Sequence, residues 1–323
     1  MGERTEIDRR GLLAVAAAGA ALGAASPAAA QLGSVLGSVP GLSGRGQDLL
    51  NLAGKFGDVL NNMQFSEADE IALGQGYYER FIDQSGGRYN SRLDQEALVE
   101  FAKPVIATTK RAEFPWEIAL IDNDTVNAWA LPGGKIGVHK GLIRYTASPE
   151  ELAAVISHEV GHAELSHGVR QIKNKRLTQG LTDIAKQQVV EAAQKKAGAV
   201  GGFVTDTFLT AMEGPFFDMV TSGYSQDLEY AADGHIVGVF HTIGYDPAHA
   251  TDFYQVLLRL FAPTTKATTS LYATHPGTKD RIKRLTQAAA RDKSPMGPNV
   301  GHPGWDQLKT SFPTRTYFRL QSA

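Results

Sequence analysis

A His-Glu-x-x-His pattern at residues 158–162 constrains this chain more than any other feature. At about 100° per residue, two histidines four positions apart lie on one helical face, so both can reach one ion. Glu159 is turned about a quarter of the way round the helix, where a base for a bound water would stand. Ser148-Pro149-Glu150-Glu151 forms a capping box with proline at the first helical position. We therefore expect a capped helix that presents His158 and His162 to a metal.

Composition narrows the class of protein. The chain has 323 residues, a net charge of -2 and 42% hydrophobic residues, which is typical of a globular chain with one large domain or two modest ones. It has no cysteine, which excludes disulfides and thiolate ligands and leaves His, Asp and Glu for a metal. Basic residues are scattered, so no nucleic-acid partner is predicted. The oligomeric state does not follow from these features.

Residues 1–30 predict an export signal. Arg9-Arg10 precedes an Ala/Gly-rich apolar run that ends in the small residues 28–30, which matches a charged start, an apolar core and a cleavage site. The paired arginines favour the twin-arginine route to the periplasm, with the general secretory route as the other option. A retained N-terminal membrane anchor is the alternative. A flexible, glycine-rich lead-in is expected over 31–65, with a short helix at 47–60.

The body of the chain predicts an α+β, mainly helical fold. Helices are expected from Ser66 to about 84 and over 93–109, followed by short strands at 116–121, 126–131 and 135–139. We expect these strands to form a small antiparallel sheet directly before the metal-binding helix. Its edge could bind an extended peptide through main-chain hydrogen bonds, or the strands could be a plain supporting hairpin.

Helices are also predicted downstream, followed by an irregular tail. The helical segments are 170–197, 228–240, 247–261 and 278–290, and the tail covers 291–323. The apolar stretch 197–219 is interrupted by glycines and by Gly214-Pro215. It leaves open a buried helix, a lid, or a loop that touches a membrane surface as a peripheral contact.

A catalytic zinc site needs a third protein ligand. His167 lies nine residues beyond His158, on the opposite face of a continuous helix. We therefore expect His167 to end that helix, with Gly168 as the stop.

Glu229 and Asp233 are better placed, because they lie four residues apart on one face of a later helix. The small residues Ala231 and Ala232 would let this helix pack closely against another. Glu229 could bind the metal while Asp233 accepts a hydrogen bond from the far nitrogen of a ligand histidine. The alternative is a solvated acidic helix start.

Four segments, in order, resemble metallopeptidase family 48, the zinc gluzincins that include HtpX, the type 1 CAAX prenyl proteases and BepA-like enzymes. They are residues 126–134 with 141–143, 158–162, 229–233 and 274–282, so the resemblance spans about 66–290. It implies a zincin-like metallopeptidase domain with one zinc ion per chain. The implied zinc ligands are His158, His162 and Glu229, with Glu159 as the base and Asp233 behind a ligand.

The same resemblance implies where substrate binds. An extended polypeptide would pair with the strand formed by Asn127, Ala128, Trp129 and Ala130. His275 and Arg281 would lie near the zinc, where either could stabilise the oxyanion. In BepA-like members the histidine that matches His275 can cap the metal.

We thus expect a soluble, exported zinc endopeptidase that cleaves misfolded or envelope proteins, with Glu159 activating a zinc-bound water. A zinc-containing envelope chaperone without turnover, or a zinc hydrolase of another amide class, are the alternatives. The chain departs from the family at three points. It lacks the membrane-spanning helices of HtpX, shows no helical repeat after residue 290, and has Gln226 where an arginine often precedes the glutamate.

Overall fold

The computed structural model describes residues 65–111, 113–173, 187, 206–261, 271, 275 and 278–315. They belong to two compact units, one formed by Phe65–Gln171 with Phe216–Ala323 and the other by Met1–Gln64 with Ile172–Pro215. The first unit contains the sheet and every predicted site residue. The expected export signal, the helix at 47–60 and most of the expected helix 170–197 lie outside the described residues.

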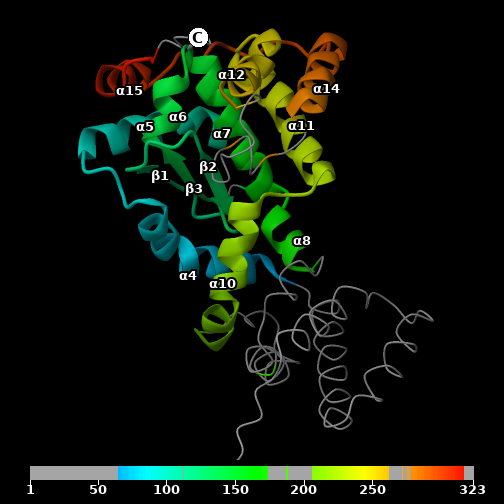
Figure 1. The fold of residues 1–323 in the computed structure, drawn as a ribbon. Coiled ribbons are helices and arrows are strands. Elements are labelled where there is room, and N and C mark those ends of the chain that lie inside the picture. The colour runs from blue at the N-terminus through cyan, green and yellow to red at the C-terminus, as the bar shows by residue number, and fades with distance from the viewer. Residues whose placement is uncertain are drawn as a thin grey trace, which may run out of the picture. The chain divides into compact units, whose positions relative to one another are not determined.

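Two capped helices precede the sheet (Figure 1). α4 (Glu67–Ser85) begins at Ser66, whose side chain accepts a hydrogen bond from the backbone N–H of Asp69, while the Asp69 carboxylate accepts from the backbone N–H of Ser66. α5 (Arg92–Ile106) begins at Ser91, whose side chain accepts a hydrogen bond from the backbone N–H of Asp94. Each cap satisfies N–H groups that a helix leaves unpaired at its start. Both helices confirm the prediction within three residues at each end.

The sheet has three strands in the order β1 (Glu117–Ile121), β3 (Lys135–His139), β2 (Ala128–Leu131). The strands lie where the sequence predicted, but the sheet is mixed. β1 runs parallel to β3 and β2 runs antiparallel to it, so the expectation of a wholly antiparallel sheet is wrong. Two reversals of direction make β1 and β3 point the same way. The tight β2–β3 hairpin, with Gly133 and Gly134 both at positive φ, then leaves β3 free to pair with β1 on its other side.

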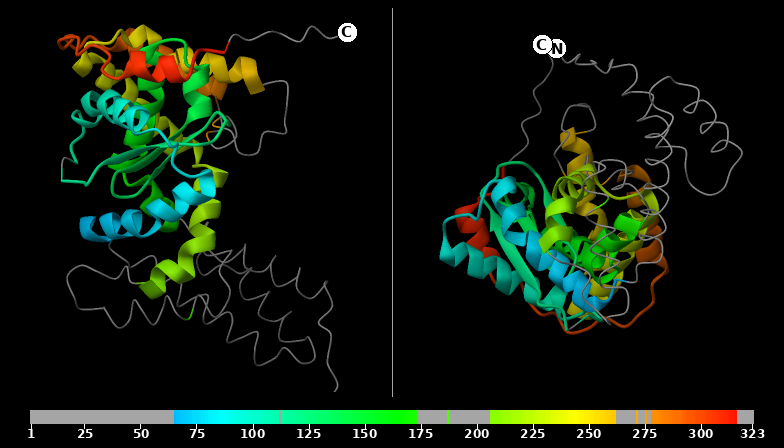
Figure 2. Two further views of the ribbon diagram at one scale, coloured as in Figure 1. Left: turned by 90° about the vertical axis from the view of Figure 1, so that its left-hand side faces the viewer. Right: turned by 90° about the horizontal axis from the view of Figure 1, so that it is seen from below.

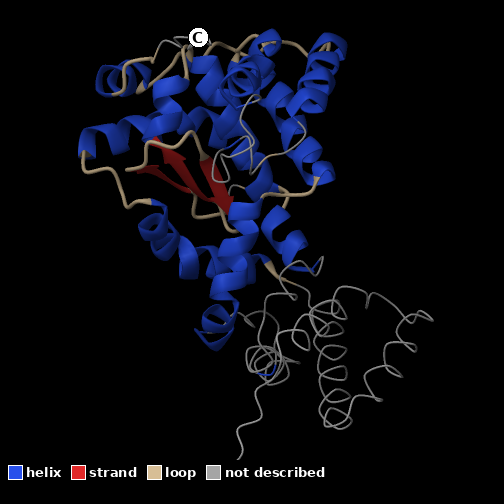
Figure 3. Cartoon of the chain, in the orientation of Figure 1, coloured by secondary structure: helices blue, strands red, loops and turns tan. Residues whose placement is uncertain are grey.

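Helices cover both faces of this sheet (Figures 2 and 3). α5 and α7 (Pro149–Glu164) pack against one face, where Leu120, Ala130 and Val138 join the main core. α4 packs against the other face. Because both faces are covered, every residue of β2 and β3 is buried, and the strands show none of the exposed positions of a half-solvated sheet.

The remaining helices follow the sheet in chain order. They are α6 (Lys140–Tyr145), α7, α8 (His167–Lys173), α10 (Asp206–Ser222), α11 (Gln226–Ile243), the 3-10 helix η1 (Pro247–Thr251), α12 (Asp252–Phe261), α14 (Thr278–Arg291) and α15 (Trp305–Ser311). α10 continues through Gly214 and Pro215, where we expected interruptions. None of the helices within the described ranges is long and apolar enough to span a membrane.

α7 and α11 form the closest helix pair of the site region. A Cβ added at Gly161 of α7 would lie 3.0 Å from the Ala232 carbonyl oxygen of α11. The glycine and the alanine therefore allow the backbones to approach, as the small residues in the sequence predicted. This contact places the first turn of α11 beside the two histidines of α7.

The C-terminal tail differs from the expectation, because residues 305–311 form a helix. Leu308 and Phe312 are fully buried in the main core. The Lys309 ammonium donates to the carbonyl oxygens of Ile143 and Thr146, at 2.9 Å each, and so caps the end of α6. A short helix of mixed composition has too little periodicity to be predicted, and here packing stabilises it.

Candidate metal centre

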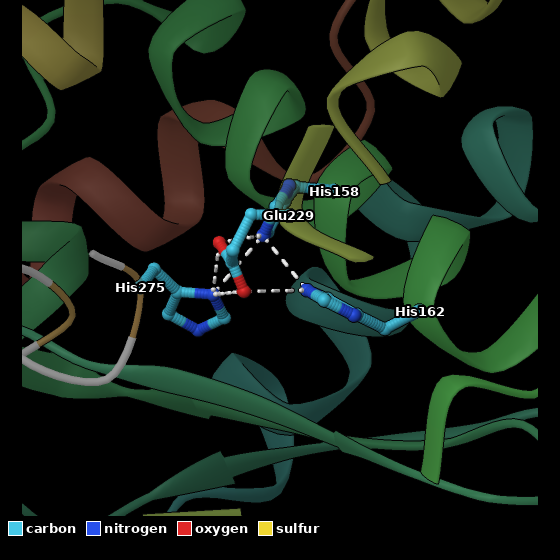
Figure 4. Close-up of side chains that lie close together, drawn as sticks. All are labelled: His158, His162, Glu229 and His275. Carbon is cyan, nitrogen blue, oxygen red and sulfur yellow. Dashed lines mark hydrogen bonds and ion pairs between the residues drawn. The ribbon is translucent and has the colours of Figure 1, made fainter. Parts of the chain in front are cut away.

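Three separate segments bring four potential metal ligands together (Figure 4). His158 and His162 come from α7, Glu229 from the first turn of α11, and His275 from the segment between α12 and α14. The Nε2 atoms of His158 and His162 are 3.0 Å apart, and each lies 3.4 Å from a Glu229 carboxylate oxygen. The predicted trio therefore converges, and all four side chains are buried.

These separations fit one zinc ion. Four ligands at about 2.0–2.1 Å in a tetrahedron are separated by about 3.3 Å. The four donor atoms lie within 4.8 Å of one another, and the closest pairs are 3.0 to 3.4 Å apart, including 3.1 Å between His158 Nε2 and His275 Nδ1. Two or three imidazoles with one carboxylate are ligands that zinc takes in proteins.

Glu159 lies beside this group and is completely buried. Among the described residues, neither of its carboxylate oxygens has a hydrogen-bond partner; the Nε2 atom of His275 lies 3.5 Å from Oε1. Burial raises the pKa of Glu159, although the charge of His275 opposes the shift. A buried carboxylate without a hydrogen bond is costly, so its position beside the four donors fits a group that exchanges protons there.

Asp233 and Arg281 hold the proposed ligands His158 and Glu229 in position through hydrogen bonds and ion pairs. Asp233 Oδ1 lies 2.9 Å from the Nδ1 atom of His158, so the carboxylate can fix the tautomer that leaves Nε2 free. The Arg281 guanidinium donates to both Asp233 oxygens, at 2.7 and 2.8 Å, and lies 2.8 Å from Glu229. It also bonds the hydroxyl of Tyr254, which itself donates to Asp233 at 3.0 Å. The sequence analysis missed Tyr254, because a tyrosine on an amphipathic helix looks like an ordinary core residue.

The charges in this network oppose the effect of burial. Burial disfavours the ionised form of Glu229, but His275 and Arg281 outweigh it and hold the pKa well below its usual value. Arg281 likewise lowers the pKa of Asp233 against burial. For His158, burial and Arg281 lower the pKa, while Asp233 and Glu229 outweigh them and raise it to about 9. Metal binding would therefore displace a proton from His158.

His275 lies at the fourth corner of the donor group. Its Nδ1 atom is 3.0 Å from both Glu229 oxygens. Arg281, the other residue expected near the oxyanion, is 1% exposed and directs its N–H groups at Asp233, Glu229, Tyr254 and the His275 carbonyl. Both residues therefore contact the proposed ligands: Arg281 lies 2.8 Å from Glu229 and 3.3 Å from the Nε2 atom of His158, while His275 supplies a donor atom of its own.

His167 does not end the helix of the motif, so that expectation is wrong. α7 ends at Glu164, Ser166 takes a left-handed conformation with φ 54°, and His167 begins α8. Its Nδ1 atom lies 2.8 Å from the Nδ1 atom of His162. The sequence held one signal for this contact, a histidine five residues after His162. On a continuous helix, however, that histidine would point away from His162.

The strand expected to bind substrate is β2, at one edge of the sheet. The ring centroids of Trp129 and Phe81 are 4.6 Å apart, and the Trp129 ring also packs against Gly137, so this side chain belongs to the core. Asn127 O accepts from β3, whereas Val126 O accepts from Leu271 N on the outer side. Because antiparallel strands alternate, the N–H and C=O groups of Ala128 and Ala130 face that outer edge, where the Ala130 carbonyl oxygen accepts from the Tyr224 hydroxyl at 3.4 Å.

Comparison with known proteins places the chain in a family. The model of peptidase family M48 matches residues 92–289. The chain is 25% identical over 230 residues to the beta-barrel assembly-enhancing protease of Escherichia coli (strain K12), covering 70% of this chain and 46% of that protein. It is 27% identical over 256 residues to the mitochondrial metalloendopeptidase OMA1 of Arabidopsis thaliana, covering 79% and 45%. The chain thus spans about half the length of these relatives. With more than half of its length matched by the family model, the chain belongs to peptidase family M48, a family of metallopeptidases.

Proposed function

We propose that this protein is a zinc-dependent endopeptidase that hydrolyses peptide bonds of polypeptides bound as an extended strand. The observation that carries the proposal is the convergence of His158, His162 and Glu229, with donor atoms 3.0 to 3.4 Å apart, beside the buried carboxylate of Glu159. Membership of a metallopeptidase family supports the same reaction. We assign one zinc ion per chain to His158, His162 and Glu229.

The residues of the site have distinct tasks in this proposal. Zinc bound there would supply Lewis-acid chemistry, polarising the scissile carbonyl and acidifying water. Glu159 accepts the proton of the attacking water and passes it to the leaving amine, for which its raised pKa suits it. Asp233 orients His158, and Arg281 keeps Asp233 and Glu229 ionised and in place. His275 is positioned to contact the developing oxyanion.

The outer edge of β2 suits an extended substrate. A peptide strand laid there would pair with the main chain of Ala128 and Ala130, independently of its side chains. Recognition through the main chain favours unfolded or loosely folded polypeptides. Misfolded or envelope proteins are the substrates we propose, which agrees with the name of the beta-barrel assembly-enhancing protease.

For location, we propose export to the periplasm by the signal at residues 1–30, with residues 66–290 as the catalytic domain. Cell fractionation tests the location: mature protein is expected in the periplasmic fraction. Full-length protein confined to the cytosol would contradict this location. Full-length protein found in the membrane fraction would support the N-terminal anchor instead.

Two measurements test the activity. Elemental analysis should find one zinc per chain, and casein digestion should stop on adding a chelator. Glu159→Gln should keep the zinc and lose turnover by at least about 100-fold, because general-base catalysis contributes that much. Glu150→Gln, the same change at the start of the same helix, serves as the matched control. Bound zinc without chelator-sensitive turnover would favour the chaperone alternative.

A further inference from the structure

His167 is a buried histidine that the mechanism above does not use. It is fully buried, and its Nδ1 atom lies 2.8 Å from the Nδ1 atom of His162. Its Nε2 atom has no hydrogen-bond partner among the described residues. The contact with His162 is therefore the main polar interaction that the structure gives this ring.

A left-handed residue creates that contact. If α7 continued as a helix, His167 would be turned about 140° away from His162. Instead Ser166 has φ 54°, which is uncommon for a residue with a side chain. The Ser166 hydroxyl donates to both oxygens of the buried Glu70 carboxylate, at 2.7 and 2.9 Å. The turn is thus held in place, and it brings His167 back toward His162.

The tautomers follow from which atoms face the metal site. The Nε2 atom of His162 faces His158 and Glu229, so it must carry a lone pair when it binds a metal. A neutral imidazole then has its proton on Nδ1. Two Nδ1 atoms at 2.8 Å share one proton, so His162 donates and His167 accepts.

The two histidine ligands are therefore supported in parallel ways. His158 directs Nε2 to the centre and Nδ1 to the Asp233 carboxylate at 2.9 Å. His162 directs Nε2 to the centre and Nδ1 to the neutral ring of His167. The Tyr224 ring stacks on His162 with centroids 4.1 Å apart and planes 18° apart, which restricts rotation of the ligand ring.

We propose that His167 is a positioning residue that fixes the tautomer and orientation of His162 for metal binding. This role rests on the proposed zinc site. It differs from a packing role because it requires an acceptor atom at the position of His167 Nδ1, whatever the shape of the rest of the side chain.

The test measures zinc affinity of the full chain by competition with a chromogenic chelator. His167→Leu should weaken zinc binding about 10- to 100-fold, the usual effect of losing a partner behind a metal ligand. His167→Asn places its amide oxygen near the position of Nδ1 and should stay within about threefold of wild type. His241→Leu is the matched control: His241 is a buried histidine about three turns further along α11 than Glu229, and its loss should leave zinc affinity unchanged.

A second measurement needs no variant, and it decides the matter if His167→Leu does not fold. Nitrogen-15 NMR of the zinc-loaded wild-type protein should show His167 protonated at Nε2 and His162 at Nδ1. Protonation of His167 at Nδ1 would overturn the role, as would wild-type zinc affinity in His167→Leu. A wild-type chain that binds no zinc would instead overturn the proposed function itself.

Discussion

At the scale of single residues, the buried arginine Arg281 stabilises two buried carboxylates. Arg281 is 1% exposed and is shared by the carboxylates of Asp233 and Glu229. Its planar fork matches two acceptors at once, which a lysine ammonium does not do. The carboxylates in turn are directed at His158 and His162. One cation therefore stabilises both a proposed ligand and the group that orients another.

Replacing Arg281 with leucine should destabilise the metal-free protein by about 3–5 kcal/mol at pH 7, because two buried carboxylates lose their shared partner. Urea denaturation in the presence of a chelator measures this. The control is Arg92→Leu, which removes an exposed arginine paired with Glu96 on one helix and should change stability far less than Arg281→Leu. Equal, small losses in the two variants would contradict the role of Arg281.

A second buried residue predicts a pH dependence of stability. Burial lowers the pKa of His139 to about 4, while its Nδ1 atom pairs with the Thr125 hydroxyl at 2.7 Å. The unfolded chain takes up this proton near pH 6.5 and the folded chain only near pH 4, so between these values the unfolded state binds more protons. His139 should therefore cost stability as the pH falls from 6.5 to 4, by up to about 3 kcal/mol.

His139→Asn tests this, because the amide can keep the bond to Thr125 but does not titrate. The difference in unfolding free energy between variant and wild type, followed by urea titration, should be constant above pH 6.5 and should shift in favour of the variant below it. Parallel curves from pH 7 to pH 4 would show that His139 does not titrate between the two states.

At the scale of elements, the site depends on close contacts between backbones and rings. β3 lies between the other strands, and its Gly137 pairs with Trp129 of β2. A Cβ at Gly137 would lie 2.2 Å from the Trp129 ring, which is itself packed against Phe81. The glycine thus makes room for a side chain that fills the core between the sheet and α4.

Gly137→Ala should destabilise the protein by about 2–3 kcal/mol, since the Trp129 ring would have to move within a packed core. Gly238→Ala is the matched control: it lies on the exposed side of α11 with no atom near the added Cβ, and it should stabilise by about 0.5–1 kcal/mol. Both changes can be measured by urea denaturation. Two effects of the same sign would contradict the packing described here.

At the scale of the whole molecule, the folded unit extends beyond the part that matches the family. The family model ends at residue 289, yet α15 follows it and contributes Leu308 and Phe312 to the main core. The Phe312 ring contacts Tyr89 edge to face, with centroids 5.1 Å apart. The chain after α14 therefore packs against Tyr89, just before α5, and against the end of α6.

Phe312→Ala should cost about 3–5 kcal/mol, as for other buried aromatic residues truncated to alanine. Met296→Ala, in the same tail but 49% exposed, should change stability by no more than about 0.5 kcal/mol. Thermal or urea unfolding of the full chain compares them. A small effect of Phe312→Ala would show that α15 is not part of the cooperative core.

The sequence by itself determined the local features of this protein. The N-cap at Ser148, the histidines one turn apart, and the pair Glu229 and Asp233 all depend on the period of one helix, which spacing reports directly. The full capping box predicted there does not form, because the Glu151 carboxylate accepts from the backbone N–H of Ala147 instead of Ser148. The three strands were likewise predictable from alternation and from the glycines of the hairpin.

Only the tertiary structure decided what depends on contacts between segments. The order of the strands, the docking of α15 and the hydrogen bonds that Arg281 and Tyr254 make to Asp233 follow from packing, which periodicity does not encode. His167 is the clearest case, because its approach to His162 depends on one left-handed residue, Ser166, held by a carboxylate 96 positions earlier in the chain. A pattern within one helix cannot report where that helix stops when the cause lies in another part of the fold.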